Sequence, residues 1–132
     1  VADDIVKVKL LSDHTPVGFC DDMCRGFMEC RGIGIINVEE LFGIRFVRLE
    51  KRIDLVVTFL EDTDEIEPDR TGLDQKTFDL LGIEIPNMEI PLRPGRDMAR
   101  LVEVAAMVQA ARQLGHDSAN DFNDKLLKKM NG

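Results

Sequence analysis

Tryptophan and tyrosine are both absent from this sequence, and histidine occurs only twice. The apolar core must therefore be built from aliphatic side chains, methionine and seven phenylalanines. No apolar run approaches the roughly 20 residues that are needed to span a membrane, and nothing at the N-terminus resembles a targeting segment. These absences argue against a membrane protein.

Positive charge is also scarce, because 17 Lys and Arg stand against 25 Asp and Glu, for a formal net charge of −8. A surface of this sign repels a nucleic-acid backbone, and the sequence has no stripe of basic and aromatic residues. We therefore do not expect a nucleic-acid partner. Phosphate chemistry remains compatible with the sequence, since local arginines can dominate the field around a site.

Cysteine is limited to Cys20, Cys24 and Cys30. An odd number of cysteines without a signal peptide indicates reduced thiols in a cytoplasm. The C-x3-C-x5-C spacing matches no common zinc arrangement, and neither histidine lies nearby. We interpret the three cysteines as small buried or half-buried side chains, and we assign no catalytic role to His14 or His116.

The 132 residues suffice for one domain, which we expect to cover 1–132, and 44% apolar and 32% charged residues are typical of a globular protein. Alternation predicts a strand over 5–11, and the glycines predict a turn between 28 and 38. The order of elements is typical of an α/β domain, a mixed sheet with helices packed on it. The other predicted elements are a helix at 38–42 capped by Asn37 and ended by Gly43, paired strands at 46–49 and 53–60, a helical turn at 78–81, strands at 83–90 interrupted by Pro86, a helix at 98–114 capped by Asp97, and a last helix capped by Asp117.

Two groups of residues that include carboxylates could take part in catalysis or metal binding. Asp3 and Asp4 precede the first predicted strand, where a carboxylate can accept a hydroxyl proton or hold Mg²⁺ beside phosphates. A solvated acidic pair is the alternative that the spacing alone favours. Glu29 and Arg31 would share one face of a strand, either as an ion pair or as a site where Mg²⁺ meets phosphate oxygens.

Arginines mark two further segments. Arg70 follows an acidic stretch and precedes Thr71-Gly72, a position that is usually a surface site. Arg93 and Arg96 flank Pro94-Gly95 just before the long predicted helix. A rigid loop that holds two guanidinium groups at a helix N-terminus suits a phosphate ligand, although the spacing is equally compatible with surface arginines.

Four segments resemble the family of bacterial HPr kinase/phosphorylases, and so do their order and their separations along the chain. The segments are Val1–Asp4, Met28–Asn37, Asp69–Gly72 and Pro91–Arg96. The stretch Leu101-Val-Glu-Val, within the predicted helix at 98–114, also resembles the family. The most specific segment is Met28, Glu29, Cys30, Arg31, Gly32, Ile33, Gly34, Ile35, Ile36 and Asn37, because it matches the signature of the family.

The resemblance implies a phosphoenolpyruvate-carboxykinase-like P-loop domain, here truncated at its N-terminus. It implies a bifunctional enzyme that phosphorylates HPr, or a related phosphocarrier of sugar uptake, on serine with ATP and Mg²⁺. The same enzyme removes the phosphate by phosphorolysis, which releases pyrophosphate. The family further implies a cytoplasmic bacterial protein that assembles as a homo-hexamer, with the C-terminal helices helping to contact HPr and neighbouring subunits.

The resemblance also assigns roles to single residues. Asp4 would accept the serine proton and return it in the reverse direction, and Asp3 would support a metal site beside it. Glu29 would help to bind Mg²⁺, and Arg70 would stabilise phosphoryl charge. The loop that serves phosphorolysis comprises Pro91, Leu92, Arg93, Pro94, Gly95 and Arg96.

The phosphate-cradling motif of the family, G-x-x-x-x-G-K-[ST], would lie upstream of Asp3, where only Val1 and Ala2 are present. We therefore expect the 132 residues alone to bind ATP negligibly. A non-catalytic binding or regulatory chain of the same fold remains an alternative. A small-molecule enzyme related to phosphoenolpyruvate carboxykinase is a third hypothesis, against which the Arg-Gly-x-Gly-Ile signature argues.

Overall fold

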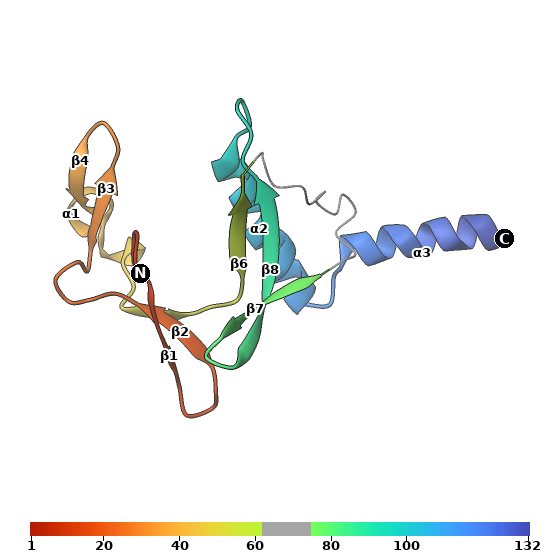
Figure 1. Cartoon of the computed structure of the whole chain (residues 1–132), viewed down its shortest axis with the longest axis horizontal. Coiled ribbons are helices and arrows are strands. Elements are labelled where there is room, and N and C mark those ends of the chain that lie inside the picture. Colours follow the sequence, from red (N-terminus) through yellow and green to blue (C-terminus); the bar gives the residue numbers. More distant parts are fainter. Residues whose placement is uncertain (62–74) are drawn as a thin grey trace. The chain divides into compact units, whose positions relative to one another are not determined.

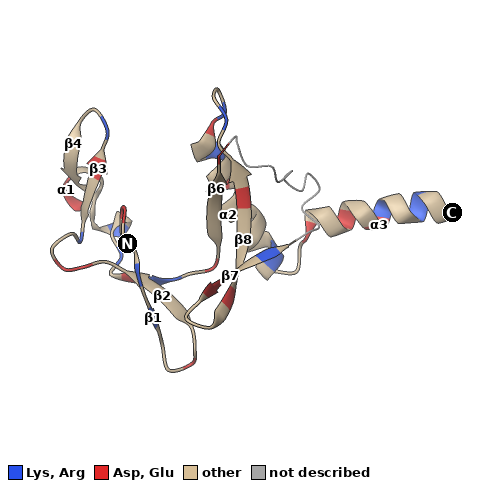
Figure 2. Ribbon diagram, in the orientation of Figure 1, with Lys and Arg blue, Asp and Glu red and all other residues tan. Residues whose placement is uncertain are grey.

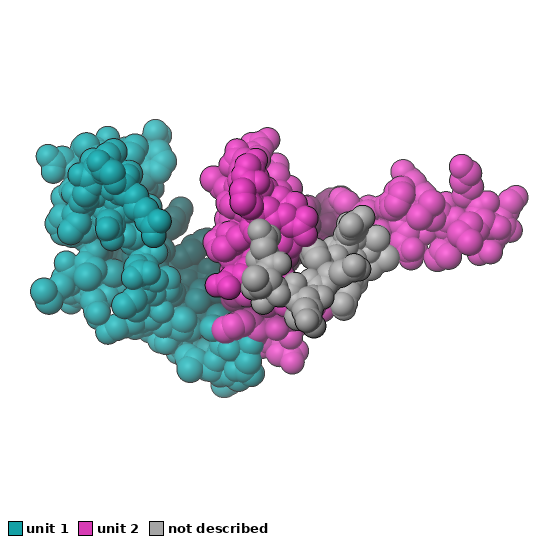
Figure 3. Space-filling view, turned by 45° about the horizontal axis from the view of Figure 1, so that its top comes forward, with its two compact units in different colours: residues 1–53, 79–83 teal, residues 54–78, 84–132 magenta. Residues whose placement is uncertain are grey.

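The computed structural model describes residues 1–61 and 75–132 (Figure 1). The chain divides into two compact units, which Figure 3 distinguishes by colour. The first unit contains Val1–Ile53 and Asp79–Ile83, and the second contains Asp54–Phe78 and Glu84–Gly132. The predicted active-site arginine, Arg70, lies outside the described residues.

The first unit is organised around a short antiparallel sheet with the strand order β1-β2-β5. Its strands are β1 (Lys7–Leu10), β2 (Pro16–Phe19) and β5 (Glu50–Arg52). In β1 the half-buried Val8 and Leu10 alternate with exposed lysines, which confirms the predicted strand although it begins two residues later. The central strand β2 is the most buried part of this unit, and sequence analysis missed it because Pro16 and Gly18 resemble a loop. Proline is tolerated here since it occupies the first position of the strand.

A tight turn joins β1 to β2. The Leu11 N–H donates to the Thr15 carbonyl over 2.9 Å, and His14 adopts a positive φ of 63°. Asp13 Oδ1 accepts the Thr15 N–H over 3.1 Å. Hydrogen bonds from the Thr15 side chain and backbone lower the pKa of Asp13 below its ordinary value, since they stabilise the ionised carboxylate.

A second hairpin in the first unit contains most of the glycine-rich segment. Strand β3 (Phe27–Cys30) pairs antiparallel with β4 (Gly34–Asn37), from Phe27↔Asn37 to Cys30↔Gly34. Gly32 and Gly34 have positive φ values of 86° and 117°, which glycine adopts without strain. Because β3 ends at Cys30 and Arg31 lies in the turn, the prediction that Glu29 and Arg31 share a face of one strand is wrong.

The hairpin continues directly into helix α1 (Val38–Phe42) and the 3₁₀ turn η1 (Ile44–Phe46). Asn37 caps α1 as predicted, because its side chain accepts the Glu40 N–H over 3.1 Å. Gly43 ends the helix, also as predicted. The strand predicted at 46–49 is wrong: the chain forms η1 there and reaches β5 only at Glu50.

The third sheet has the strand order β6-β8-β7. Its strands are β6 (Val56–Leu60), β7 (Lys76–Leu80) and β8 (Ile83–Pro91). Strand β6 pairs parallel with β8, so the expected pairing of 53–60 with the segment just before it is wrong. A hydrogen bond of 2.8 Å between Thr58 Oγ1 and Asn87 Oδ1 links the parallel strands.

Strand β7 occupies the segment for which a helical turn was predicted. Leu81 and Gly82 both have positive φ, 53° and 86°, which is typical of the two-residue turn of a β-hairpin. Strand β8 runs through Pro86 without a break, so the predicted interruption is also wrong.

Two helices follow β8, α2 (Met98–Gln113) and α3 (Ser118–Asn131). Asp97 accepts the Arg100 N–H, and Asp117 accepts the N–H groups of Ala119 and Asn120, which confirms both predicted caps. In α2, Ala105 and Gln109 are buried whereas Met107 is 60% exposed. Among the described residues, no helix has the length and apolar character required to cross a membrane.

Gly18 shows how tightly the first sheet is packed beneath the segment that carries Asp4. A Cβ atom at Gly18 would lie 2.9 Å from Val6 Cγ1 and 3.5 Å from Ile53 Cδ1. We therefore expect Gly18→Ala to lower the free energy of unfolding by roughly 1–3 kcal/mol, the usual cost of overpacking. Urea denaturation followed by circular dichroism measures this loss.

Val6→Ala provides the matched control for this prediction, because it removes the atom that the new methyl group would strike. The double variant Gly18→Ala/Val6→Ala should be more stable than the sum of the two single effects predicts. Strictly additive losses would contradict the packing argument, since the two sites would then not interact.

Candidate functional site

The segment before β1 and strand β3 meet at one hydrogen bond. Asp3 Oδ2 accepts the backbone N–H of Glu29 over 2.9 Å, although the two residues are 26 positions apart. This bond brings together two of the predicted site segments, the Asp3-Asp4 pair and the glycine-rich stretch. Both belong to the first unit.

A pocket of about 540 Å³ opens beside this contact. Asp4 and Glu29 both line it, so the structure places these two predicted residues at one pocket. Asp4 makes no hydrogen bond or ion pair with the residues that the structure describes, which leaves its carboxylate available to a ligand. The complete lining is Asp3, Asp4, Ile5, Cys20, Asp21, Met23, Cys24, Phe27, Met28, Glu29 and Ile35.

The charge of this pocket is negative. Asp3, Asp4, Asp21 and Glu29 all contribute to its lining, and the acidic residues are red in Figure 2. Lys7 on β1 forms an ion pair with Asp21, and the hydrogen bond that Lys7 donates to that carboxylate raises the pKa of the lysine. The remaining carboxylates favour a cation over a bare phosphate at this position.

The oxygen donors fit Mg²⁺, which proteins hold with one or two carboxylates while substrate phosphates and water complete the coordination. Within residues 1–61 and 75–132, no group of three or more His, Cys, Asp or Glu is placed to hold a metal ion. That finding is compatible with Mg²⁺ bound jointly with a phosphate substrate, and it argues against an all-protein cage.

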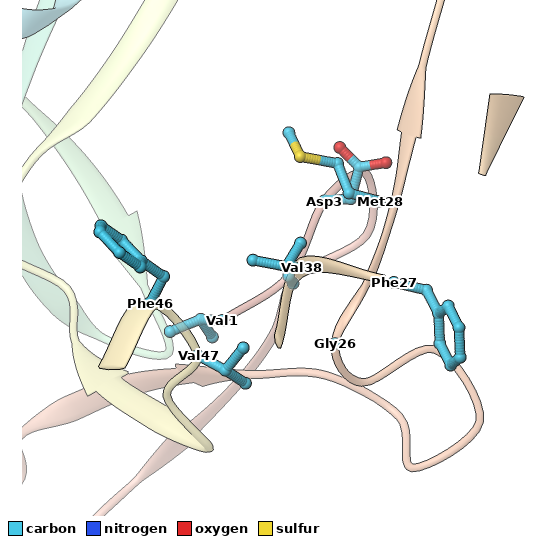
Figure 4. Close-up of a pocket in the computed structure, with 9 residues that line it drawn as sticks. Val1, Asp3, Gly26, Phe27, Met28, Val38, Phe46 and Val47 are labelled. Carbon is cyan, nitrogen blue, oxygen red and sulfur yellow. The ribbon is translucent and has the colours of Figure 1, made fainter. Parts of the chain in front are cut away.

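A smaller pocket of about 200 Å³ lies on the other side of the same contact. Most of its lining is apolar and includes Val1, Val38, Phe46 and Val47, which Figure 4 shows as sticks. Asp3 lines both pockets, as do Phe27 and Met28.

The arginine loop lies in the second unit, between β8 and α2. Its turn is closed by the Arg96 N–H, which donates to the Arg93 carbonyl over 3.3 Å, and Gly95 has a positive φ of 76°. Arg93 and Arg96 are both exposed. The loop begins where the parallel strands β6 and β8 end together, at Leu60↔Pro91, and it leads directly into the N-terminus of α2. Such a strand–loop–helix junction suits an anion.

The profile of the protein family described as HPr Serine kinase C-terminal domain matches residues 1–126. The chain belongs to this family. It is 42% identical to the HPr kinase/phosphorylase of Leptospira biflexa over 96% of its own length, and 39% identical to that of Geobacter sulfurreducens over 98%. The chain spans only 40% and 41% of the length of these two relatives.

A solved structure, the Hpr(Ser) kinase/phosphatase from Coxiella burnetii, superposes with a TM-score of 0.78 at 28% sequence identity. The match covers 92% of this chain and 74% of that one. The predicted family and the predicted phosphoenolpyruvate-carboxykinase-like α/β fold are therefore confirmed.

In this chain of the HPr kinase family, some of the predicted site residues line the larger pocket and others do not. Asp3, Asp4 and Glu29, together with Met28 and Ile35 of the glycine-rich stretch, line the larger pocket. Asn37 instead caps α1, Arg31 lies in the hairpin turn, and the Pro91–Arg96 loop belongs to the second unit.

Several residues of the larger pocket were not predicted from the sequence. Cys20, Asp21, Met23 and Cys24 approach it from the turn between β2 and β3. Cys20 is buried and Cys30 half-buried as expected, but Cys24 is exposed, which corrects the interpretation of all three as covered side chains. No signal in the sequence placed this turn beside Asp4.

Proposed function

We propose that this chain forms part of the catalytic domain of a bifunctional kinase/phosphorylase. The complete protein transfers a phosphoryl group from ATP to a serine of HPr or a related phosphocarrier, and it removes that group by phosphorolysis to pyrophosphate. The observation that carries the proposal is that Asp4 and Glu29 line one pocket in a chain of the HPr kinase family. The names of the curated relatives support the same activity.

Asp4 is the general base in this proposal. Its exposed carboxylate accepts the proton of the substrate serine as the hydroxyl oxygen attacks the phosphoryl group, which prevents a positive charge from building up on that oxygen. In phosphorolysis the same group returns the proton to the serine oxygen as the bond to phosphorus breaks. Both directions transfer a proton at the same serine oxygen, so we expect one residue to serve both.

Glu29 supplies a carboxylate for Mg²⁺, with Asp3 beside it as a candidate supporting group. Mg²⁺ would neutralise charge on the phosphate oxygens during transfer. The role of Glu29 depends on where strand β3 holds its backbone, because the side chain extends from that strand.

In this proposal the arginines bind the phosphoryl group and the inorganic phosphate. Arg70 stabilises phosphoryl charge in this proposal, and the Pro91–Arg96 loop holds the inorganic phosphate that attacks phosphoserine. Guanidinium groups bind phosphate oxygens through two parallel hydrogen bonds, which fixes the orientation of the anion as well as its position. We further propose that the complete protein is a cytoplasmic homo-hexamer whose C-terminal helices help to contact HPr.

The 132 residues contain no G-x-x-x-x-G-K-[ST] segment. The acidic pocket does not replace such a loop, because it offers carboxylates where ATP phosphates need N–H donors and cations. In the proposed enzyme the nucleotide is therefore held by a part of the protein outside these residues. The same observation favours the second candidate, a binding chain of this fold without kinase activity.

One experiment separates these two candidates. The complete open reading frame around these residues is sequenced and expressed, and its product is incubated with HPr, ATP and Mg²⁺. Mass spectrometry should find one phosphoserine on HPr, and added phosphate should remove it with release of pyrophosphate. A reading frame that encodes the phosphate loop and yields no phosphoserine would refute the kinase proposal. A frame without the loop, whose product binds HPr without modifying it, would establish the binding chain.

A further inference from the structure

We propose that Asp3 is a positioning residue, whose carboxylate fixes Asp4 and Glu29 relative to each other. It does so by accepting the backbone N–H of Glu29, and its contribution does not depend on binding the metal ion. The inference rests on the proposed function, because it assigns a task to a third residue of the same site.

The need for such a residue follows from where Asp4 lies in the chain. The pairing of β1 with β2 begins at Lys7↔Phe19, three residues after Asp4. Residues 3 and 4 form a bend in front of that strand. The ladder of the first sheet therefore does not hold Asp4 directly, and its position depends on contacts of its immediate neighbours.

The donor side of the contact is equally specific. Strand β3 has β4 as its neighbour in a two-stranded sheet, where Glu29 lies opposite Ile35. The Glu29 N–H points away from β4 and donates to Asp3, so it occupies the other edge of β3. An N–H on a strand edge is not paired within the sheet, so it can bind a group from another segment. The Asp3 carboxylate accepts this N–H and thereby holds the segment of Asp3 and Asp4 against the strand that contains Glu29.

The identity of the side chain matches this task. A carboxylate accepts an N–H bond more strongly than a neutral oxygen does, and an aspartate is short enough to hold the two backbones close together. Asp3 also lines both the acidic pocket and the apolar one. Loss of this contact would let the Asp4 segment move relative to Glu29.

Two substitutions distinguish positioning from metal binding. Asp3→Asn keeps an oxygen that accepts the Glu29 N–H but loses the charge that a Mg²⁺ ligand needs, whereas Asp3→Ala loses both. In the complete protein we expect Asp3→Ala to lower kcat for serine phosphorylation about tenfold, the usual effect of losing a hydrogen bond to a charged group. We expect Asp3→Asn to stay within about threefold of the unsubstituted protein, because a neutral acceptor recovers most of such a bond.

The Mg²⁺ dependence of the rate is the decisive readout for this pair. The concentration of Mg²⁺ that gives half-maximal rate should be unchanged in Asp3→Asn, because this variant loses the charge but keeps the contact that positions Glu29. Equal losses in Asp3→Asn and Asp3→Ala, together with a raised Mg²⁺ requirement, would overturn the proposal and make Asp3 a metal ligand.

Amide hydrogen exchange tests the same contact without any activity. In the unliganded protein, Asp3→Ala should speed exchange at the Glu29 amide, and Asp3→Asn should retain most of the protection. Asp22→Ala is the matched control, since it removes an exposed carboxylate of the same unit whose recorded partner is Arg25.

Unchanged exchange at Glu29 in Asp3→Ala would overturn the proposal, whatever the activity of the protein. If the unsubstituted protein does not phosphorylate HPr, the proposed function fails while the exchange result still decides whether Asp3 holds Glu29. The two failures are therefore distinguishable.

Discussion

Asp4→Asn in the complete protein is expected to lower the rate of serine phosphorylation by roughly 10²–10⁴-fold, the range that a well-placed general base contributes. The amide has nearly the same shape as the carboxylate, so it preserves the lining of the pocket. It cannot accept the serine proton, because an amide oxygen is a very weak base. Single-turnover phosphorylation of HPr with saturating ATP and Mg²⁺ measures the effect on chemistry rather than on binding.

Phosphorolysis should fall by a similar factor in Asp4→Asn, since one residue handles the proton in both directions. Asp22→Asn is the control for charge, because Asp22 is an exposed carboxylate outside the lining of the pocket. Its rates should match those of the unsubstituted protein. A normal phosphorylation rate in Asp4→Asn would remove Asp4 from the mechanism, and a loss in one direction alone would show that another residue serves the reverse step.

Local signals explain which elements could be predicted. Helices α2 and α3 were expected because each begins at an aspartate whose side chain caps the first turn, and the structure confirms both caps. The same holds for α1, which is enclosed by Asn37 and Gly43. Capping depends on residues within one helical turn of each other, so the sequence contains the whole interaction.

Strands were harder to predict because their partners lie elsewhere in the chain. Nothing within β6 indicates that it pairs with β8, about 30 residues later, and the expected partner was the segment immediately before it. Strand β2 combines a proline with a glycine, yet it is the central strand of its sheet because burial between β1 and β5 outweighs weak local propensity.

Residues of the site could be predicted from the sequence, but the contacts between them could not. The family resemblance identified Asp4 and Glu29, and the structure places both in one pocket. Neither spacing nor periodicity indicated that Asp3 would bond to the Glu29 backbone, because the contact joins a bend to a strand edge 26 residues away. Asp21 was missed for the same reason, as it lies in the loop after β2 whereas its partner Lys7 lies on β1.

Arg96→Ala should reduce phosphorolysis more than phosphorylation, by roughly 10–150-fold, which corresponds to the 1.5–3 kcal/mol of a charge-assisted hydrogen bond. The loop is built for such a contact, because its turn closes between Arg93 and Arg96 and leads directly into the N-terminus of α2. The Arg96 side chain makes no hydrogen bond or ion pair with the described part of the chain, so it is available to an incoming phosphate.

The rate of pyrophosphate release as a function of phosphate concentration measures the loss, and the increase should lie in the KM for phosphate. Arg96→Lys keeps the charge but not the paired donors, so it should recover only part of the activity. Arg100→Ala is the matched control: this arginine lies one helical turn further on, in an ion pair of 3.2 Å with Glu103. Equal losses of phosphorylation and phosphorolysis in Arg96→Ala would show that the loop serves phosphoryl transfer in general. A loss in Arg100→Ala of the same size would show that any positive charge near the start of α2 suffices.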